Sequence, residues 1–266
     1  MNLHLSGKSA IVTGGSAGIG FAIAKALYAE GVNVVLVSRD PDNLSQAKNR
    51  IEAEPAAAGE PQVVTVSGDV RQTDTVERAV NLAIEKFGKI DILINNAGAT
   101  RSGEFLKQPE EELVDAWNSK LLGYIRFVKA VTPHMIRQQD GRIVNIIGGA
   151  ARTPSPLFVA GGTANAAILN FTKGISKELA KHHIRINAIS PGVTATERAD
   201  RLAEQRAEAK GISVDEERSK TAAAIPLGRL VDPSEIAALA LLFVSDRVPS
   251  LTGVELVIDG GQKPGM

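Results

Sequence analysis

The feature that most constrains the fold of this chain is the alternation of short apolar runs with longer stretches of helical periodicity. Strands that are apolar throughout are buried on both faces, so the intervening helices must cover a parallel sheet from both sides. The sequence predicts a single doubly wound α/β domain over residues 1–266, with about seven strands. The predicted strands are 9–12, 32–37, 62–66, 90–94, 142–147, 185–189 and 254–258, and the predicted helices are 21–27, 44–53, 73–87, 110–135, 162–182 and 233–244.

Two segments fall outside this rhythm. Residues 52–61 are rich in Ala, Glu and Pro, and we expect a surface extension without chemistry. Residues 194–222 are charged and Ala-rich and follow the carboxyl end of a predicted strand, where open α/β sheets bind ligands. We interpret residues 194–222 as a helical substrate lid, and the alternative is a solvated helix without a ligand role.

Composition narrows the class of partner. Thirty basic and thirty acidic side chains cancel, so no long-range field favours nucleic acid or an anionic membrane. The absence of cysteine and the dispersal of four histidines argue against a metal site. No apolar run is long enough to span a bilayer, and residues 1–8 lack a basic region followed by an apolar stretch. We therefore expect a cytoplasmic protein that acts on a small molecule.

A glycine-rich turn lies at residues 13–20, between the first predicted strand and the first helix. Glycines let the backbone approach a pyrophosphate, and the helix amino end offers free N–H groups and a positive dipole. Such a turn alone is weak evidence, because tight turns need glycine for steric reasons too. Its position at the opening of a βαβ unit favours a dinucleotide site.

The end of the second predicted strand indicates which dinucleotide is bound. An acidic residue there usually binds the adenosine ribose of NAD, whereas here Ser38 and Arg39 precede Asp40. A hydroxyl and a guanidinium suit a 2′-phosphate, so NADP(H) is favoured over NAD(H). The alternative is that Arg39 is a solvated loop cation and Asp40 binds the ribose.

The glycine-rich turn belongs to a set of motifs through which the chain resembles the short-chain dehydrogenase/reductase family over nearly its whole length. The resemblance rests on the Thr-Gly-x-x-x-Gly-x-Gly turn at 13–20, Asn-Asn-Ala-Gly at 95–98, Gly-Asp-Val at 68–70, the strand and Pro-Gly turn at 185–192, and the terminal strand at 252–261. It implies a Rossmann-type fold with a retained cofactor pocket. The predicted cofactor contacts are Gly14, Ser16, Ala17, Gly18, Ile19, Gly20, Ser38, Arg39, Asp69, Val70, Asn96, Ala97, Gly98, Pro191, Gly192, Val193, Thr194 and Thr196.

The same resemblance breaks down at the catalytic positions. Family members use a Tyr-x-x-x-Lys pair, a serine on the fifth strand and an asparagine on the preceding helix. Setting this chain against the family pattern puts Gly148 at the serine, Gly161 at the tyrosine, Asn165 at the lysine and Lys120 at the asparagine. General acid–base catalysis contributes about 10²–10⁴ in rate, so a replacement proton donor or another reaction is needed.

Lys120 is the first candidate for that replacement, since burial could lower its pKa into a useful range. It could equally be a structural cation that binds the cofactor's ribose or loop carbonyls. Asn165 could hydrogen-bond the nicotinamide ribose, and Thr163 is a weaker catalytic candidate with capping as its ordinary role. The glycine pairs 148–149 and 161–162 would enlarge the cavity above the nicotinamide or let the backbone approach a ligand, and the alternative is that they merely accommodate local turns.

Three functions remain open from the sequence. The favoured one is an NADP(H)-dependent oxidoreductase with a non-standard proton donor, acting on a small carbonyl, imine or enone compound. The second is a catalytically silent NADP(H)-binding sensor or assembly protein, and the third is a non-redox enzyme that uses the old pocket.

The resemblance also implies a homo-oligomer, a tetramer before a dimer, formed through helices 110–135 and 162–182. The second of these helices carries apolar side chains that could form the contact face or could pack on the sheet. They are Ala166, Ala167, Ile168, Phe171 and Ile175.

Overall fold

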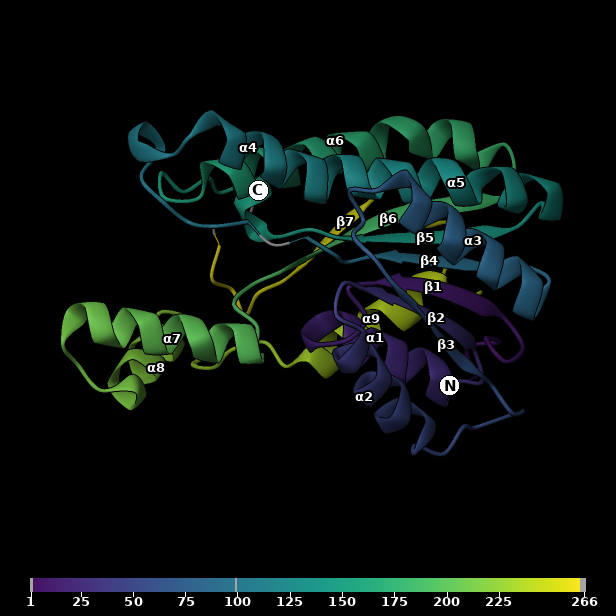
Figure 1. Cartoon of the computed structure of the whole chain (residues 1–266), viewed down its shortest axis with the longest axis horizontal. Helices are drawn as coiled ribbons and strands as arrows, with labels where there is room; N and C mark the ends of the chain where they lie inside the picture. The colour runs from purple at the N-terminus through teal and green to yellow at the C-terminus, as the bar shows by residue number, and fades with distance from the viewer. Residues whose placement is uncertain (1, 99, 264–266) are drawn as a thin grey trace.

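A parallel sheet forms the centre of the molecule (Figure 1) in the computed structural model, which describes residues 2–98 and 100–263. The strand order is β3-β2-β1-β4-β5-β6-β7. Strands β2 and β3 are added on one side of β1 and the later strands on its other side, so the order in which strands are added reverses between β1 and β4, as in doubly wound folds. The strands are Ser9–Thr13 (β1), Asn33–Ser38 (β2), Val63–Ser67 (β3), Ile92–Asn95 (β4), Gly141–Ile146 (β5), Ile184–Pro191 (β6) and Glu255–Ile258 (β7). The predicted fold class is confirmed.

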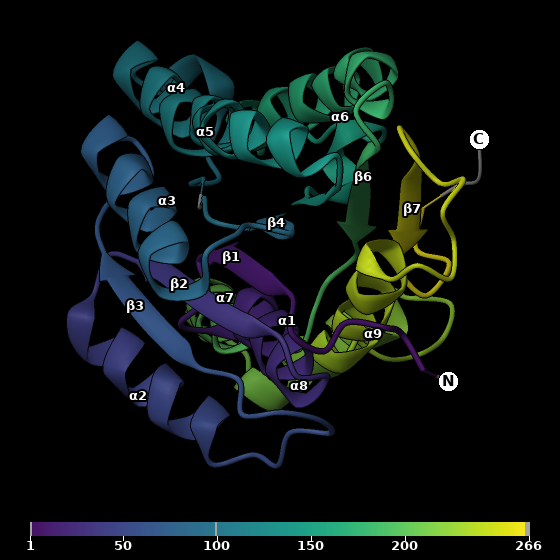
Figure 2. The same cartoon turned by 90° about the vertical axis from the view of Figure 1, so that its right-hand side faces the viewer.

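Helices cover both faces of the sheet, and Figure 2 shows the two layers edge-on. On one face lie α1 (Gly18–Ala29), α2 (Pro41–Glu52) and α9 (Pro233–Val244), and on the other lie α3 (Thr73–Phe87), α4 (Glu110–Trp117), α5 (Gly123–Gln138) and α6 (Val159–Ala180). Short helical turns occupy Phe105–Lys107 (η1) and Gly149–Ala151 (η3).

Strand β2 shows why this sequence requires two helical layers. Val34 and Leu36 pack into the core beneath α1, α2 and α9, whereas Val35 and Val37 pack into the core beneath α3, α5 and α6. Consecutive residues of a strand point to opposite faces, so an unbroken apolar run has to be covered from both sides. The unbroken apolar runs thus fix the layered architecture.

The long helix predicted over 110–135 is interrupted. Between α4 and α5 the residues Asn118–Leu122 (η2) form a π-helical turn, in which the Gly123 N–H donates to the Asn118 carbonyl five residues back. Arg126 stabilises this arrangement: its Nη1 donates to the Asn118 carbonyl at 3.2 Å and its Nη2 to Asn118 Oδ1 at 2.6 Å. π-Turns often occur at functional sites, and this one carries Lys120.

The segment predicted as a helical lid forms two helices, α7 (Glu197–Lys210) and α8 (Val214–Ala223), which project from the sheet in Figure 1. The Thr196 hydroxyl accepts a hydrogen bond from the Ala199 N–H at 3.4 Å and so caps α7. Lys210 Nζ lies 2.7 Å from the almost fully buried carboxylate of Glu217, which joins the two helices. Across the described residues, no helix is long and apolar enough to cross a membrane.

Candidate active site

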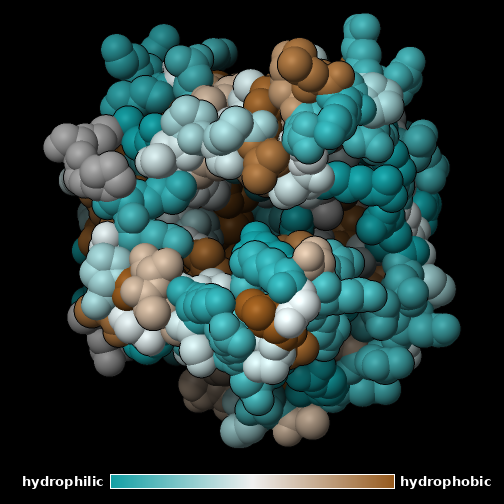
Figure 3. Space-filling view, turned by 90° about the vertical axis from the view of Figure 1, so that its left-hand side faces the viewer, coloured by the Kyte–Doolittle hydropathy of each residue, from teal (hydrophilic) through white to brown (hydrophobic). Residues whose placement is uncertain are grey.

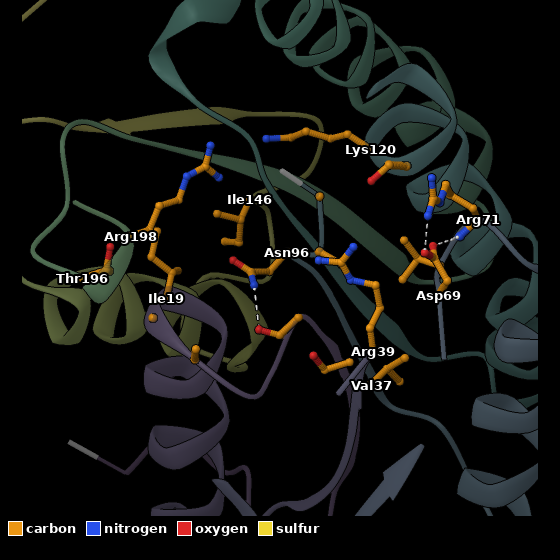
Figure 4. Close-up of a pocket in the computed structure, with 18 of the residues that line it drawn as sticks. Ile19, Val37, Arg39, Asp69, Arg71, Asn96, Lys120, Ile146, Thr196 and Arg198 are labelled. Carbon is orange, nitrogen blue, oxygen red and sulfur yellow. Dashed lines mark hydrogen bonds and ion pairs between the residues drawn. The ribbon is translucent and has the colours of Figure 1, made fainter. Parts of the chain in front are cut away.

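A cleft of about 490 Å³ lies at the carboxyl ends of β1 to β5, a volume within the ordinary range for small-molecule sites. Figure 3 shows it as a hollow with a mainly polar rim and apolar side chains deep inside, and Figure 4 shows its lining. One end is formed by the turns after β1, β2 and β3, and the other by η2, the end of β5 and the first turn of α7.

The glycine-rich turn after β1 forms the floor of the first end. Gly18 has φ +55°, a conformation that L side chains rarely adopt, and a Cβ on Gly20 would overlap the Gly14 carbonyl oxygen. Glycine is therefore needed at both positions for the helix to begin so close to the strand. The N-cap residue, Ala17, has no capping side chain, which leaves the first N–H groups of α1 available to an anion.

Asn96 ties the turn after β4 to this glycine turn. Its Nδ2 donates to the carbonyl oxygens of Thr13 and Gly14, each at 3.2 Å, and its backbone N–H donates to Thr13 Oγ1 at 2.9 Å. Ala97 N donates to the same hydroxyl at 3.1 Å. This network fixes two adjacent walls of the cleft.

Arg39, at the end of β2, extends into the cleft between Asn96 and Asp69 (Figure 4). Within the described part of the chain its side chain forms no ion pair. Asp40 is engaged elsewhere, because its Oδ1 accepts hydrogen bonds from the N–H groups of Asp42 and Asn43, both at 2.9 Å, and caps α2. The alternative in which Asp40 binds a ribose is therefore disfavoured.

The turn after β3 carries a fully paired charge cluster. Arg71 contacts the carboxylate of Asp69, with Nη2 to Oδ2 at 2.7 Å, and also pairs with Asp115 of α4. The hydrogen bond from Arg71 is the main cause that holds the pKa of Asp69 below its usual value, and the same contacts raise the pKa of Arg71. Asp69 is thus ionised and held rigidly at the rim.

Lys120 lies at the other end of the cleft, half-buried on the π-turn. It packs over Gly98, where an added Cβ would come within 3.0 Å of Lys120 Cβ. Its ammonium has no hydrogen-bond or ion-pair partner among the described residues, and it points toward the Arg198 guanidinium (Figure 4). Burial, and secondarily the charge of Arg198, lower the pKa of Lys120 to about 8.

Other side chains fill the space beside the glycines predicted to enlarge the cavity. A Cβ on Gly161 would overlap the Phe158 ring and lie 2.6 Å from Thr100 Oγ1, and a Cβ on Gly149 would overlap the Lys263 side chain. The prediction of a larger cavity is wrong at these two positions, because neighbouring side chains pack into the room that glycine leaves.

Asn165 lies next to Gly148: an added Cβ on Gly148 would be 3.1 Å from Asn165 Nδ2. Asn165 is 2% exposed, and its Oδ1 has no partner in the described part of the chain. Thr163 faces α4 instead, accepting from Trp117 Nε1 at 2.9 Å, and does not line the cleft. The two tyrosines are buried, and Tyr124 donates to the Ile146 carbonyl oxygen at 2.7 Å.

The cleft gathers two thirds of the predicted cofactor contacts. Those that line it are Gly14, Ala17, Gly18, Ile19, Ser38, Arg39, Asp69, Val70, Asn96, Ala97, Gly98 and Thr196. Ser16, Gly20, Pro191, Gly192, Val193 and Thr194 lie outside the lining, although Ser16 Oγ donates to Ser38 Oγ at 2.9 Å. The lining residues that sequence reasoning missed include Arg71, Asp115, Ser119, Ile146, Arg198 and Arg201.

Three of the apolar residues of α6 that are predicted to form an oligomer interface pack in two different parts of the protein's own core. Ile168 is 0% exposed and packs in its own core with Tyr124 and Ala188, so it cannot belong to a contact face. Phe171 and Ile175 are partly buried against the core beneath α3 and α5. The alternative of packing on the sheet holds for Ile168.

Comparison with known proteins identifies the family. The chain matches the sequence model of the family described as short chain dehydrogenase over residues 8–207. It is 38% identical over 260 residues to the oxidoreductase UcpA of Salmonella typhimurium, covering 97% of this chain and 95% of that protein. L-Sorbose reductase from Gluconobacter frateurii, solved with NADPH and L-sorbose, covers 100% of both chains with a TM-score of 0.94 and 28% identity. NAD⁺-bound xylitol dehydrogenase covers 97% of this chain and 100% of its own with a TM-score of 0.88 and 28% identity. This chain belongs to the short-chain dehydrogenase family.

Proposed function

We propose that the protein is an NADP(H)-dependent oxidoreductase that acts on a small carbonyl, imine or enone compound and uses Lys120 as its proton donor. The observation that carries this proposal is the unpaired Lys120 ammonium, without a partner among the described residues, at the end of the cleft away from Arg39. A half-buried ammonium without a partner is costly to maintain, so a reacting group that accepts its hydrogen bond accounts for it.

The residues present fit NADP(H). The uncapped N–H groups of α1 would hold the pyrophosphate, and Arg39 with Ser38 would hold the 2′-phosphate. Asn165, which the sequence places at the nicotinamide ribose, is 2% exposed and does not line this cleft, so the fit rests on α1, Ser38 and Arg39. A solved relative with 28% identity binds NADPH, which supports the choice, although another relative binds NAD⁺. When bound, this cofactor supplies the hydride.

Lys120 would do the work that the family assigns to tyrosine. The chain's two tyrosines do not line the cleft, and the Phe158 ring fills the space into which a side chain at 161 would grow. An ammonium whose pKa is about 8 is protonated at neutral pH and can still release its proton to a developing alkoxide. The charged group that faces Lys120 is Arg198, whose positive charge favours loss of the Lys120 proton.

The test is the pH dependence of NADPH oxidation with a panel of carbonyl, imine and enone compounds. Because the donor must be protonated, kcat/KM for reduction should be constant below pH about 7 and fall as the pH rises through about 8. Lys120→Met should lower kcat by about 10²- to 10³-fold and remove this fall, while the NADPH affinity stays within about threefold of wild type. A Lys120→Met variant with the wild-type rate and pH profile would refute the role of Lys120.

A catalytically silent NADP(H)-binding protein is the second candidate, and the packing at position 161 favours it. Phe158 seals the family's proton-donor position with an apolar ring, as a chain without a need for acid catalysis would allow. The distinguishing result is NADPH binding, seen by nicotinamide fluorescence, without oxidation by any compound of the panel. That result would establish the silent function in place of the reductase.

A further inference from the structure

The two ends of the cleft differ in how their charges are balanced. At the end formed by the turns after β1, β2 and β3, the charge of Arg71 is neutralised by Asp69 and Asp115. At the opposite end, Lys120 and Arg198 face each other, and neither has a carboxylate partner among the described residues (Figure 4). The acidic residue nearest to Arg198 in sequence, Glu197, is exposed and lies 3.9 Å from Arg201 rather than from Arg198. This end of the cleft therefore carries uncompensated positive charge.

Arg198 reaches the region where a substrate would react. Its Nη2 donates to the carbonyl oxygen of Thr100 at 3.2 Å. The hydroxyl of Thr100 in turn lies 2.6 Å from the Cβ position of Gly161, where the family pattern has its tyrosine. The guanidinium thus extends from the first turn of α7 across the cleft to the wall that borders the substrate.

Like charges that face each other in a cleft are unfavourable unless an anion lies between them. The repulsion is evident in the pKa of Lys120, which Arg198 helps to lower. In the proposed NADP(H) complex the cofactor's own anions already have partners, since α1 and the glycine turn would bind the pyrophosphate and Arg39 the 2′-phosphate. The anion that Arg198 and Lys120 lack must therefore come from another molecule.

We propose that the substrate is an oxo acid whose carboxylate is bound by Arg198, with its carbonyl group directed to Lys120. This inference rests on the proposed function for the carbonyl chemistry and adds the class of substrate. A guanidinium presents a planar pair of donors that matches a carboxylate, whereas a single ammonium suits one oxygen. The apolar floor of Ile146 and Ile147 would contact the short carbon skeleton between them.

The test is calorimetric binding of oxamate, an unreactive oxo-acid analogue, against its neutral amide, oxamide, to the full-length protein with and without saturating NADPH. The wild type should bind oxamate about 10- to 100-fold more tightly than oxamide, as expected for a charge-assisted pair. In Arg198→Gln this preference should fall below about threefold, with the NADPH affinity unchanged. Arg201→Gln is the matched control, because Arg201 lies on the same helix, lines the same cleft and is paired with Glu197.

Three results would overturn the inference: equal or absent binding of the two analogues by the wild type, a preference that persists in Arg198→Gln, or about tenfold or more weaker NADPH binding in Arg198→Gln. The last would show that Arg198 serves the cofactor. Failure of the proposed function is seen separately, as absent NADPH binding or absent turnover of oxo acids. Because the oxamate preference is measured without turnover, it tests the contact between Arg198 and a carboxylate whether or not the protein reduces oxo acids.

Discussion

The proposed preference for NADP(H) leads to a direct prediction about Arg39. Replacing Arg39 by alanine should weaken NADPH binding and leave NADH binding almost unchanged, because only NADPH carries a 2′-phosphate. Arg39 is suited to this test because its guanidinium points into the cleft and has no acidic partner among the described residues. The substitution therefore breaks no ion pair within that part of the protein, and its effect on binding reports the contact with the ligand.

The expected magnitude follows from the exposure of this side chain. A hydrogen bond to a charged group contributes about 1.5–3 kcal/mol, which corresponds to roughly 10- to 150-fold in affinity. Arg39 is exposed at the rim, where water screens the interaction, so the lower limit applies. We expect the Kd for NADPH to rise about tenfold at low salt and the Kd for NADH to change less than about threefold.

The assay is titration of nicotinamide fluorescence with each dinucleotide at two ionic strengths. Arg101→Ala is the control, since the Arg101 side chain is 87% exposed and does not line the cleft. Ser38→Asp should act in the same direction as Arg39→Ala, because a carboxylate repels the phosphate. Equal losses for NADPH and NADH in Arg39→Ala, or no loss for either, would refute the assignment of Arg39 to the 2′-phosphate.

Two further predictions concern stability, measured by urea unfolding at constant protein concentration. Gly161→Ala should destabilise the protein by about 1 kcal/mol, because the clash of the new Cβ with Phe158 and Thr100 costs about 1–3 kcal/mol and the helix propensity of alanine returns about 1. In a Phe158→Ala background most of this penalty should disappear and only the close approach to Thr100 Oγ1 should remain, so a penalty of unchanged size there would contradict the packing argument. The second prediction concerns Glu235, whose pKa is lowered to about 2 by hydrogen bonds from Arg229 and then from the Asp232 backbone. The ionised Glu235 should therefore stabilise the protein fully above its unfolded pKa near 4.5, and this contribution should be lost as the pH falls toward 2. Glu235→Gln should lose less stability than the wild type over that interval, and identical acid profiles would show that the ion pair contributes nothing.

The fold was accessible from sequence because its signals are local. The apolar runs that form β1, β4, β5 and β6 are buried along their whole length, so each of them marks a central strand on its own. The division of the helix predicted over 110–135 was not accessible. It depends on a π-turn in which the Asn118 carbonyl accepts from both the Gly123 N–H and Arg126, and such contacts leave no periodicity in the sequence.

The residues of the candidate site also fall into those that the sequence predicts and those that it does not. Glycine turns and strand ends are constrained by backbone geometry, so motifs reveal residues such as Gly18, Arg39 and Asn96. Arg198 belongs to no motif, and its position follows only from the direction in which α7 leaves β6. Phe158 was also missed, since a loop side chain that fills the volume left by Gly161 has to be found in three dimensions.

The sequence pattern predicts that Gly148 and Gly161 stand at catalytic positions of the family, and the packing around these glycines bears on whether the site has decayed or been rebuilt. A site that loses a large side chain without compensation keeps a cavity, which costs about 24 cal/mol per Å³. Here Phe158 packs into the space beside Gly161, and Asn165 lies beside Gly148, so both glycines are closely packed. Packing alone does not account for Lys120, because facing its ammonium with Arg198 is electrostatically unfavourable. The repulsion between these two cations lowers stability, so their joint presence at this end of the cleft favours a ligand that carries negative charge.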